Sequence, residues 1–219
     1  INQNTIDDLL PLRSFPIERV LRLNLFHDRT CAEVERGIQA GATWMMLPMV
    51  RNTKEVERFV ELVNGRTGTI ALVETLAGLI NLKDIASISG LDEIYLGLND
   101  MSLESGWPFC YRFLSEGILD HFLSDCTKPY GFGGITVVDA GKPLSSANII
   151  KEYARLGTTL AILRRAFKKD IIGRDFKYEI GRIKSLYRSS QNRTLNEKER
   201  DQAEIWHRIR QIIPSHTRL

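Results

Sequence analysis

The sequence reads GTIALVETLAGLINLKDIASISGLDEIYLGLND over residues 68–100. It contains two short apolar runs, GTIALVE (68–74) and EIYLGL (93–98), which have the length and composition of buried β-strands. The segment between them is long enough for a helical crossover, and each run closes on or near an acidic residue, Glu74 or Asp100. A strand followed by a helical crossover and a second strand predicts that the two strands lie next to each other in a parallel sheet.

The same alternation of strand and helix continues on both sides of this stretch. Four more strands are expected, at residues 19–25, 43–50, 130–136 and 159–163. Apolar residues at helical spacing predict helices over 53–64 and 146–156, and we expect a further helix over 165–188. Such alternation is typical of an α/β protein with a parallel sheet.

Several polar residues and one glycine mark where the predicted helices begin and end. Asn52 and Thr194 are each followed three residues later by a glutamate, the pattern of a capping box at a helix start. Gly157 stands where a helix C-cap belongs. We expect a break over residues 189–194, followed by a last helix that ends near Pro214.

Four residues recur at a fixed interval along the chain. Arg22, Pro48, Glu74 and Asp100 follow one another at steps of 26 residues, each at or just past the end of a predicted strand. The carboxyl ends of parallel strands lie on one rim, where the active sites of (β/α) barrels form. We therefore expect the arginine, the glutamate and the aspartate to converge; the alternative is coincidence among residues common at strand ends.

The types of residue at this rim suit a metal-assisted reaction. Two carboxylates offer oxygen ligands only, which a hard cation such as Mg²⁺ or Mn²⁺ prefers. A 2-oxo acid can add its carboxylate and keto oxygens, and the metal then stabilises the enolate formed when a carbon–carbon bond breaks. Arg22 suits the substrate carboxylate or the enolate oxygen. Three glycines near the rim would let substrate approach the backbone, or are simply tight strand ends: Gly97, Gly133 and Gly134.

Composition restricts the class of protein. The 219 residues are 43% hydrophobic and 26% charged, as expected of a globular protein with a sizeable core. No apolar run approaches the roughly 20 residues of a membrane span, and the first residues lack the layout of a secretory signal. Three widely spaced cysteines form neither a disulfide framework nor a metal motif, so we expect a cytoplasmic protein with no membrane partner.

The net charge of +3 is concentrated in residues 188–219. Acidic residues are interleaved with the basic ones there, which favours a solvated helix face over a nucleic-acid-binding surface. We therefore expect no nucleic-acid partner. The apolar residues of this last helix would pack on their own domain or on another subunit.

Four segments together resemble one known family. They are VLRLN (20–24), MLPMV (46–50), the long stretch from Val73 to Gly106, and YGFGGI (130–135). They look like the citrate lyase β-subunit and 2-oxo-acid (4-hydroxy-2-oxoheptanedioate-type) aldolase family of the pyruvate–phosphoenolpyruvate barrel superfamily. Within it, the likeness is greatest to members found in bacterial surface-polysaccharide gene clusters. The long stretch supplies the most specific matches to the family pattern: Glu74, Thr75, Gly78, Asn81 and Asp100.

The resemblance implies a TIM (β/α)8-type barrel with Glu74 and Asp100 as metal ligands and Arg22 as the catalytic, substrate-binding arginine. It also implies a homo-oligomer, a trimer or a hexamer. Three further residues are expected to contact substrate: Asn24 beside Arg22, Asn99 beside Asp100, and Arg165 after the last strand.

The motif order also predicts that the barrel is incomplete. The strand of Arg22 corresponds to the third of the family, so the first two strand–helix units have no counterpart in these residues. We therefore expect an incomplete barrel domain over residues 1–188 and a C-terminal helical tail over 189–219. The histidine that the aldolases carry after their second strand also has no counterpart; His27 lies nearest the predicted rim, as a candidate acid/base or as a solvated loop residue.

Three functions remain open. The first is a metal-dependent carbon–carbon lyase acting on a 2-oxo acid through an enolate. The second is a truncated or degenerate barrel that serves as a binding or assembly module in a surface-polysaccharide pathway. The third is a transferase that uses phosphoenolpyruvate, since that substrate would chelate the metal in a similar way.

Overall fold

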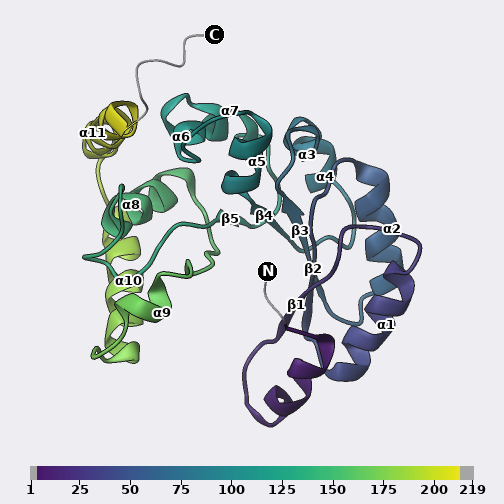
Figure 1. The fold of residues 1–219 in the computed structure, drawn as a ribbon. Coiled ribbons are helices and arrows are strands. Elements are labelled where there is room, and N and C mark those ends of the chain that lie inside the picture. The colour runs from purple at the N-terminus through teal and green to yellow at the C-terminus, as the bar shows by residue number, and fades with distance from the viewer. Residues whose placement is uncertain (1–3, 213–219) are drawn as a thin grey trace. The chain divides into compact units, whose positions relative to one another are not determined.

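The computed structural model describes residues 4–212 (Figure 1). The chain divides into two compact units. The first comprises the residues up to Gly97 together with Cys126–Pro129, and the second comprises Leu98–Asp125 together with the residues from Tyr130 onward. The first unit contains strands and helices, and the second is mainly helical with the single strand β5 (Tyr130–Phe132).

The first unit is built on a parallel sheet of short strands. These are β1 (Val20–Arg22), β2 (Trp44–Leu47), β3 (Gly68–Val73) and β4 (Glu93–Leu96). They lie side by side in chain order, with Arg22 opposite Met46 and Val73 opposite Leu96. All four strands therefore end at the same edge, as predicted from the alternation of strand and helix.

Four helices connect these strands (Figure 1). They are α1 (Thr30–Ala40), α2 (Thr53–Val63), α3 (Leu76–Ile80) and α4 (Leu82–Ala86), while the 3-10 helix η1 (Ile6–Ser14) precedes β1 and packs on α1. Helix α2 begins as predicted, because the side chain of Asn52 accepts a hydrogen bond from the backbone N–H of Glu55 at 3.1 Å. Its residues Val56, Phe59 and Val63 repeat at helical spacing and are fully buried.

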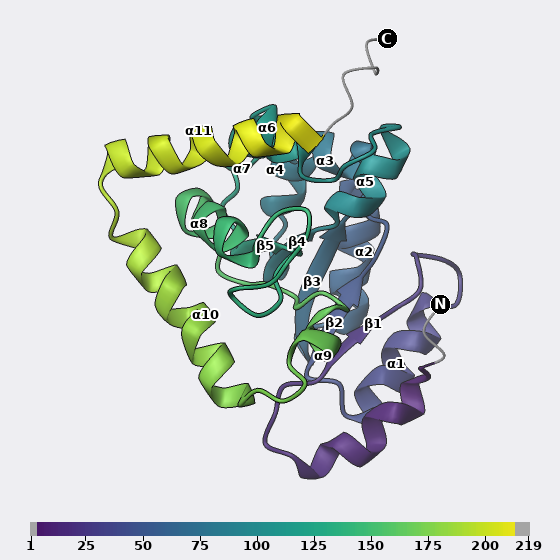
Figure 2. The ribbon, with the colours of Figure 1, turned by 60° about the vertical axis from the view of Figure 1, so that its left-hand side comes forward.

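The second unit is mainly helical. It contains β5 (Tyr130–Phe132), α5 (Leu98–Glu104), α6 (Arg112–Ser115), α7 (Ile118–Leu123), α8 (Ser146–Leu156), α9 (Phe167–Asp170), α10 (Phe176–Gln191) and α11 (Leu195–Ile212). Helix α8 ends as predicted at Gly157, which adopts the left-handed conformation. Helix α10 packs on α8 (Figure 2). The division between a domain over 1–188 and a tail over 189–219 stays a prediction.

Helix α11 packs on α6 and α8 of its own chain, which was one of the two arrangements left open by the sequence. Ile205 and Ile209 are buried in this packing. Thr194 and Glu197 form the predicted capping box, with hydrogen bonds in both directions. The end expected near Pro214 lies outside the described residues.

Two predicted elements are wrong. Residues 159–163 form only an isolated bridge, Gly131 to Leu160, because β5 beside them has three residues and offers a very short ladder. The single helix predicted over 165–188 is two helices, α9 and α10, and α10 continues through Gln191 into the predicted break. Gly173 turns the chain at a φ of 77°, and Asp175 then caps α10 by accepting from the N–H of Tyr178.

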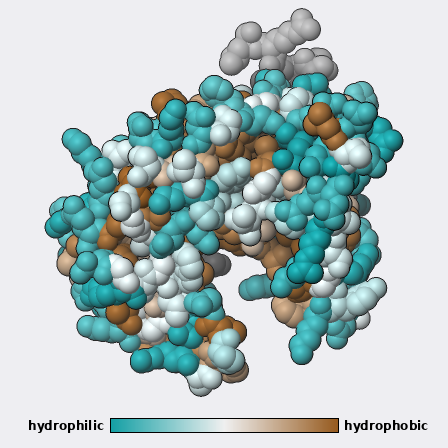
Figure 3. Space-filling model, turned by 180° about the vertical axis from the view of Figure 1, so that it is seen from behind, coloured by the Kyte–Doolittle hydropathy of each residue, from teal (hydrophilic) through white to brown (hydrophobic). Residues whose placement is uncertain are grey.

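The face of the molecule drawn in Figure 3 is mostly polar. On the face shown in Figure 3, hydrophilic side chains predominate and hydrophobic residues form small patches between them. No helix within residues 4–212 has the length and apolar character to cross a membrane.

The side chain of Phe59, in α2, is fully buried, so it should contribute strongly to the stability of the first unit. We expect Phe59→Ala to lower the free energy of unfolding by about 3–5 kcal/mol, through lost apolar contact and the cavity left behind. Urea unfolding followed by circular dichroism measures the change. Phe15→Ala is the matched control, since Phe15 is 56% exposed and its loss should cost less than about 0.5 kcal/mol. Equal effects of the two substitutions would contradict the packing.

Candidate functional site

An ion pair joins two strand ends of the first unit. Glu74 directly follows β3, and Arg22 is the last residue of β1. The Nη2 of Arg22 donates to the Oε1 of Glu74 at 3.0 Å, although β2 runs between their strands. The Glu74 side chain is only 3% exposed whereas that of Arg22 is 58% exposed, so the arginine reaches from the solvent side to a buried carboxylate.

The backbone after β2 contributes to the same carboxylate. The N–H of Met49 donates to the Oε1 of Glu74 at 3.1 Å. Met49 has a φ of 55°, an uncommon conformation for a residue with a side chain, and it follows Pro48 of the 26-residue series. Met49 could not be identified from its residue type, because it acts through its backbone N–H, a group that every residue except proline carries.

Gly97 lies against Glu74. A Cβ built on Gly97 would stand 2.3 Å from the Cβ of Glu74 and 2.9 Å from its Oε2. The glycine after β4 therefore makes room for the glutamate itself. Its predicted role in letting substrate approach the backbone stays a prediction.

The other residues of the glutamate motif are structural. The hydroxyl of Thr75 accepts from the N–H of Gly78 at 2.9 Å and donates to the carbonyl of Val50 at 2.7 Å. A Cβ on Gly78 would lie 2.2 Å from the same carbonyl. The amide of Asn81 donates to the carbonyl of Arg51 at 3.0 Å. Together these contacts fix α3 against the segment after β2 and so fix the backbone that carries Glu74.

A second polar group follows β1. The backbone N–H of Asn24 donates to Glu33 at 3.2 Å, and the Asn24 side-chain amide donates to the same carboxylate. The Nε2 of His27 lies 3.3 Å from Glu33 Oε1. Glu33 thus contacts both residues that were predicted near the rim, and no sequence pattern indicated this role of Glu33. The predicted contact of Asn24 with substrate stays a prediction.

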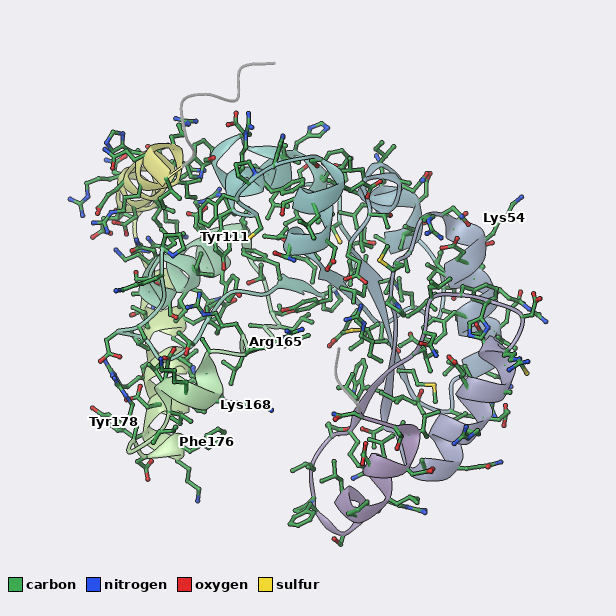
Figure 4. The ribbon with its side chains drawn as sticks, in the orientation of Figure 1. Lys54, Tyr111, Arg165, Lys168, Phe176 and Tyr178 are labelled. Atoms are coloured by element: carbon green, nitrogen blue, oxygen red, sulfur yellow. The ribbon has the colours of Figure 1, made fainter. Side chains whose placement is uncertain are left out.

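The remaining candidates belong to the second unit. Asn99 and Asp100 are exposed in the first turn of α5. Gly133 and Gly134 follow β5, and the Tyr111 hydroxyl occupies the space where a Cβ of Gly134 would stand. Arg165 is exposed (Figure 4).

The site residues are thus distributed over both units. The structure brings Arg22, Glu74 and Gly97 together in the first unit. The pairing of Glu74 with Asp100 stays a prediction from sequence.

The thiol of Cys110, in the second unit, is partly buried. Burial raises the pKa of the Cys110 thiol, and weaker opposing effects come from backbone N–H groups and from Arg164. A protonated thiol is a poor nucleophile, so burial lowers the reactivity of Cys110.

Comparison with known proteins identifies relatives of this chain. Residues 3–108 match the sequence model of the HpcH/HpaI aldolase/citrate lyase family, which confirms the predicted resemblance. No curated protein matches the sequence significantly.

Solved structures share the fold. A HpcH/HpaI aldolase/citrate lyase family protein from Burkholderia cenocepacia J2315 superposes with a TM-score of 0.62 at 15% identity, over 83% of this chain and 81% of that one. The citrate synthase SbnG gives 0.59 at 21% identity, over 84% and 80%. A Mycobacterium tuberculosis citrate lyase beta subunit, complexed with oxaloacetate and magnesium, gives 0.50 at 19% identity, over 77% and 72%. These likenesses confirm the predicted fold class.

The contact between Gly97 and Glu74 can be tested through stability. Gly97→Ala places a methyl group inside the glutamate side chain, and we expect the free energy of unfolding to fall by about 1–3 kcal/mol. The control is Gly181→Ala in α10, where a Cβ meets nothing within 4 Å and the better helix propensity of alanine should add up to about 1 kcal/mol. Urea unfolding midpoints compare the two; a harmless Gly97→Ala would contradict the packing.

Proposed function

Because residues 3–108 belong to the HpcH/HpaI aldolase/citrate lyase family, we propose that the chain is a carbon–carbon lyase acting on a 2-oxo acid. The observation that carries the proposal is the pairing of Arg22 with Glu74 at the carboxyl edge of the sheet. A buried carboxylate beside a solvent-facing guanidinium can present negative charge to a cation and positive charge to an anionic substrate at the same place.

The donor set fits a hard divalent cation. We propose Glu74 and Asp100 as the protein ligands of Mg²⁺ or Mn²⁺, because both offer oxygen atoms only. Within residues 4–212, no three His, Cys, Asp or Glu side chains gather closely enough to hold a metal by themselves. Substrate and water oxygens would therefore complete the shell, as is usual for Mg²⁺. The related citrate lyase beta subunit complexed with oxaloacetate and magnesium supports both the metal and the 2-oxo acid.

The cation would supply Lewis-acid stabilisation of the charge that develops on a 2-oxo acid. Arg22 would supply the second positive group. Apart from the bond to Glu74, its N–H groups have no acceptor among the described residues, so they are available to a substrate carboxylate or to an enolate oxygen. In the cleavage direction, the bond between the carbon next to the keto group and a carbinol carbon would break: the carbinol proton would pass to water, that carbon would leave as an aldehyde, and the electron pair would pass into the enolate, whose negative oxygen Arg22 would neutralise.

The fixed position of Glu74 matters for this role. Its Oε1 accepts from Arg22 and from the Met49 N–H, so the carboxylate cannot rotate freely. Preorganised charges avoid a reorganisation cost when the transition state forms. The lyase would therefore depend on the Met49 turn as well as on the charged side chains.

Metal binding is the first test. We expect Mn²⁺ to bind the chain in a calorimetric titration, and to bind more tightly with oxalate, which mimics a pyruvate enolate. Glu74→Gln should abolish the binding and Asp100→Asn should weaken it, since each removes a charged oxygen ligand.

The matched control for that titration is Glu57→Gln, because Glu57 is an exposed glutamate of α2 that does not belong to the proposed site. It should leave the Mn²⁺ affinity unchanged. Absence of Mn²⁺ binding to the unsubstituted chain would contradict the lyase proposal and favour a binding or assembly module. An equal loss of Mn²⁺ affinity in Glu57→Gln and Glu74→Gln would contradict the assignment of the metal site.

The role of Arg22 can be tested separately from that of the proposed metal ligands. Arg22→Gln should keep Mn²⁺ binding but reduce the strengthening by oxalate about tenfold, because it removes one charge-assisted hydrogen-bonding partner of the anion. Titration of oxalate into the Mn²⁺-loaded protein measures this. The same titration is made on Arg165→Gln, since Arg165 is exposed. A comparable loss of oxalate affinity would support the predicted substrate contact of Arg165, and an unchanged affinity would contradict that contact.

A further inference from the structure

The second unit contains a pocket that has no part in the proposed lyase site. It has a volume of about 560 Å³ and lies between α8, α10 and the extended segment 158–163. Pockets for small organic molecules usually fall between about 300 and 1,000 Å³. All of its lining residues belong to the second unit, so the pocket is complete within it.

The interior of the pocket is apolar. Its floor is formed by the buried side chains of Ile135, Ile150 and Tyr153. Ile180 and Ile183 of α10 also line it but are only half-buried. Half-buried isoleucines leave apolar surface in contact with water, and a ligand with an apolar body would gain free energy by covering that surface.

The two tyrosine hydroxyl groups in the wall are already engaged within the chain. The Tyr187 hydroxyl donates to the carbonyl of Thr158 at 2.6 Å, and the Tyr153 hydroxyl donates to the carbonyl of Phe132 at 2.6 Å. These two hydroxyls are therefore not free to donate to a ligand, and the isoleucines of the lining leave an apolar surface that favours a hydrocarbon body.

Two cations stand at its mouth. Lys184 and Arg188 are one helical turn apart on α10, on the face that also carries Ile180, Ile183 and Tyr187. Both are exposed, and neither has an acidic partner among the described residues.

The other arginines of α10 and of the turn before it are different. Arg174 bonds Asp139 and Glu179, and Arg182 bonds Glu179. The positive charge at the pocket mouth is therefore uncompensated, unlike that of Arg174 and Arg182.

We propose that this pocket binds a small anionic amphiphile, with its hydrocarbon body between α8 and α10 and its oxyanion head on Lys184 and Arg188. The head is a carboxylate or a phosphate, since both accept hydrogen bonds from these cations. The site is independent of Arg22, Glu74 and the proposed lyase reaction.

Titration calorimetry on the full chain with octanoate, octyl phosphate and octanol tests the site. We expect both anions to bind, and octanol to bind at least tenfold more weakly. Whichever anion binds more tightly identifies the head group. The double variant Lys184→Gln, Arg188→Gln should lose about tenfold in affinity for the anions, while Lys177→Gln, a lysine of the same helix outside the pocket, should lose none.

The location is tested by filling the pocket. Ile183→Trp should abolish octanoate binding, whereas Ile172→Trp should not, because Ile172 is 78% exposed and does not line the pocket. Circular dichroism verifies that both variants fold. If octanoate does not bind the unsubstituted chain, if octanol binds equally well, or if folded Ile183→Trp binds octanoate normally, the proposal is overturned.

Discussion

The carboxylate of Glu74 is buried, and the arrangement of the first unit follows from how that charge is accommodated. A buried charge is costly unless it is paired and hydrogen-bonded. Arg22 at the end of β1, Met49 after β2 and Gly97 after β4 all contact this one residue, which directly follows β3. These contacts are possible only if all the strands run parallel and in register. The interval of 26 residues reflects this geometry, since each step crosses one strand and one connection.

Much of this could be predicted from the sequence where apolar periodicity and helix caps agree. The alternation of apolar runs and helical segments predicted the four strands that contain Val20, Trp44, Gly68 and Glu93. Helices α2 and α8 also have their predicted caps. The meeting of Arg22 with Glu74 was also predicted, because the carboxyl ends of parallel strands share an edge.

Other features could not be predicted because they depend on partners distant in sequence or on the backbone. Met49 contributes an N–H group, which leaves no trace in residue type. Leu160 forms only a bridge because its neighbour β5 is short. The helix expected over 165–188 is interrupted because Gly173 and Asp175, which favour a turn and a new N-cap, outweigh the apolar periodicity around them.

The course of the chain through the second unit has a consequence for its synthesis. Leu98–Asp125 belongs to that unit, but it is made long before the helix that covers it, and the guanidinium of Arg210 in α11 donates to the carbonyl of Ser115 at 2.7 Å. On the ribosome, the apolar face of α6 that packs on α11 therefore stays uncovered until α11 has been made. Exposed apolar surface of this kind is what aggregation and chaperones act on. The first unit, whose segment Cys126–Pro129 is made much earlier, can complete its core while translation continues.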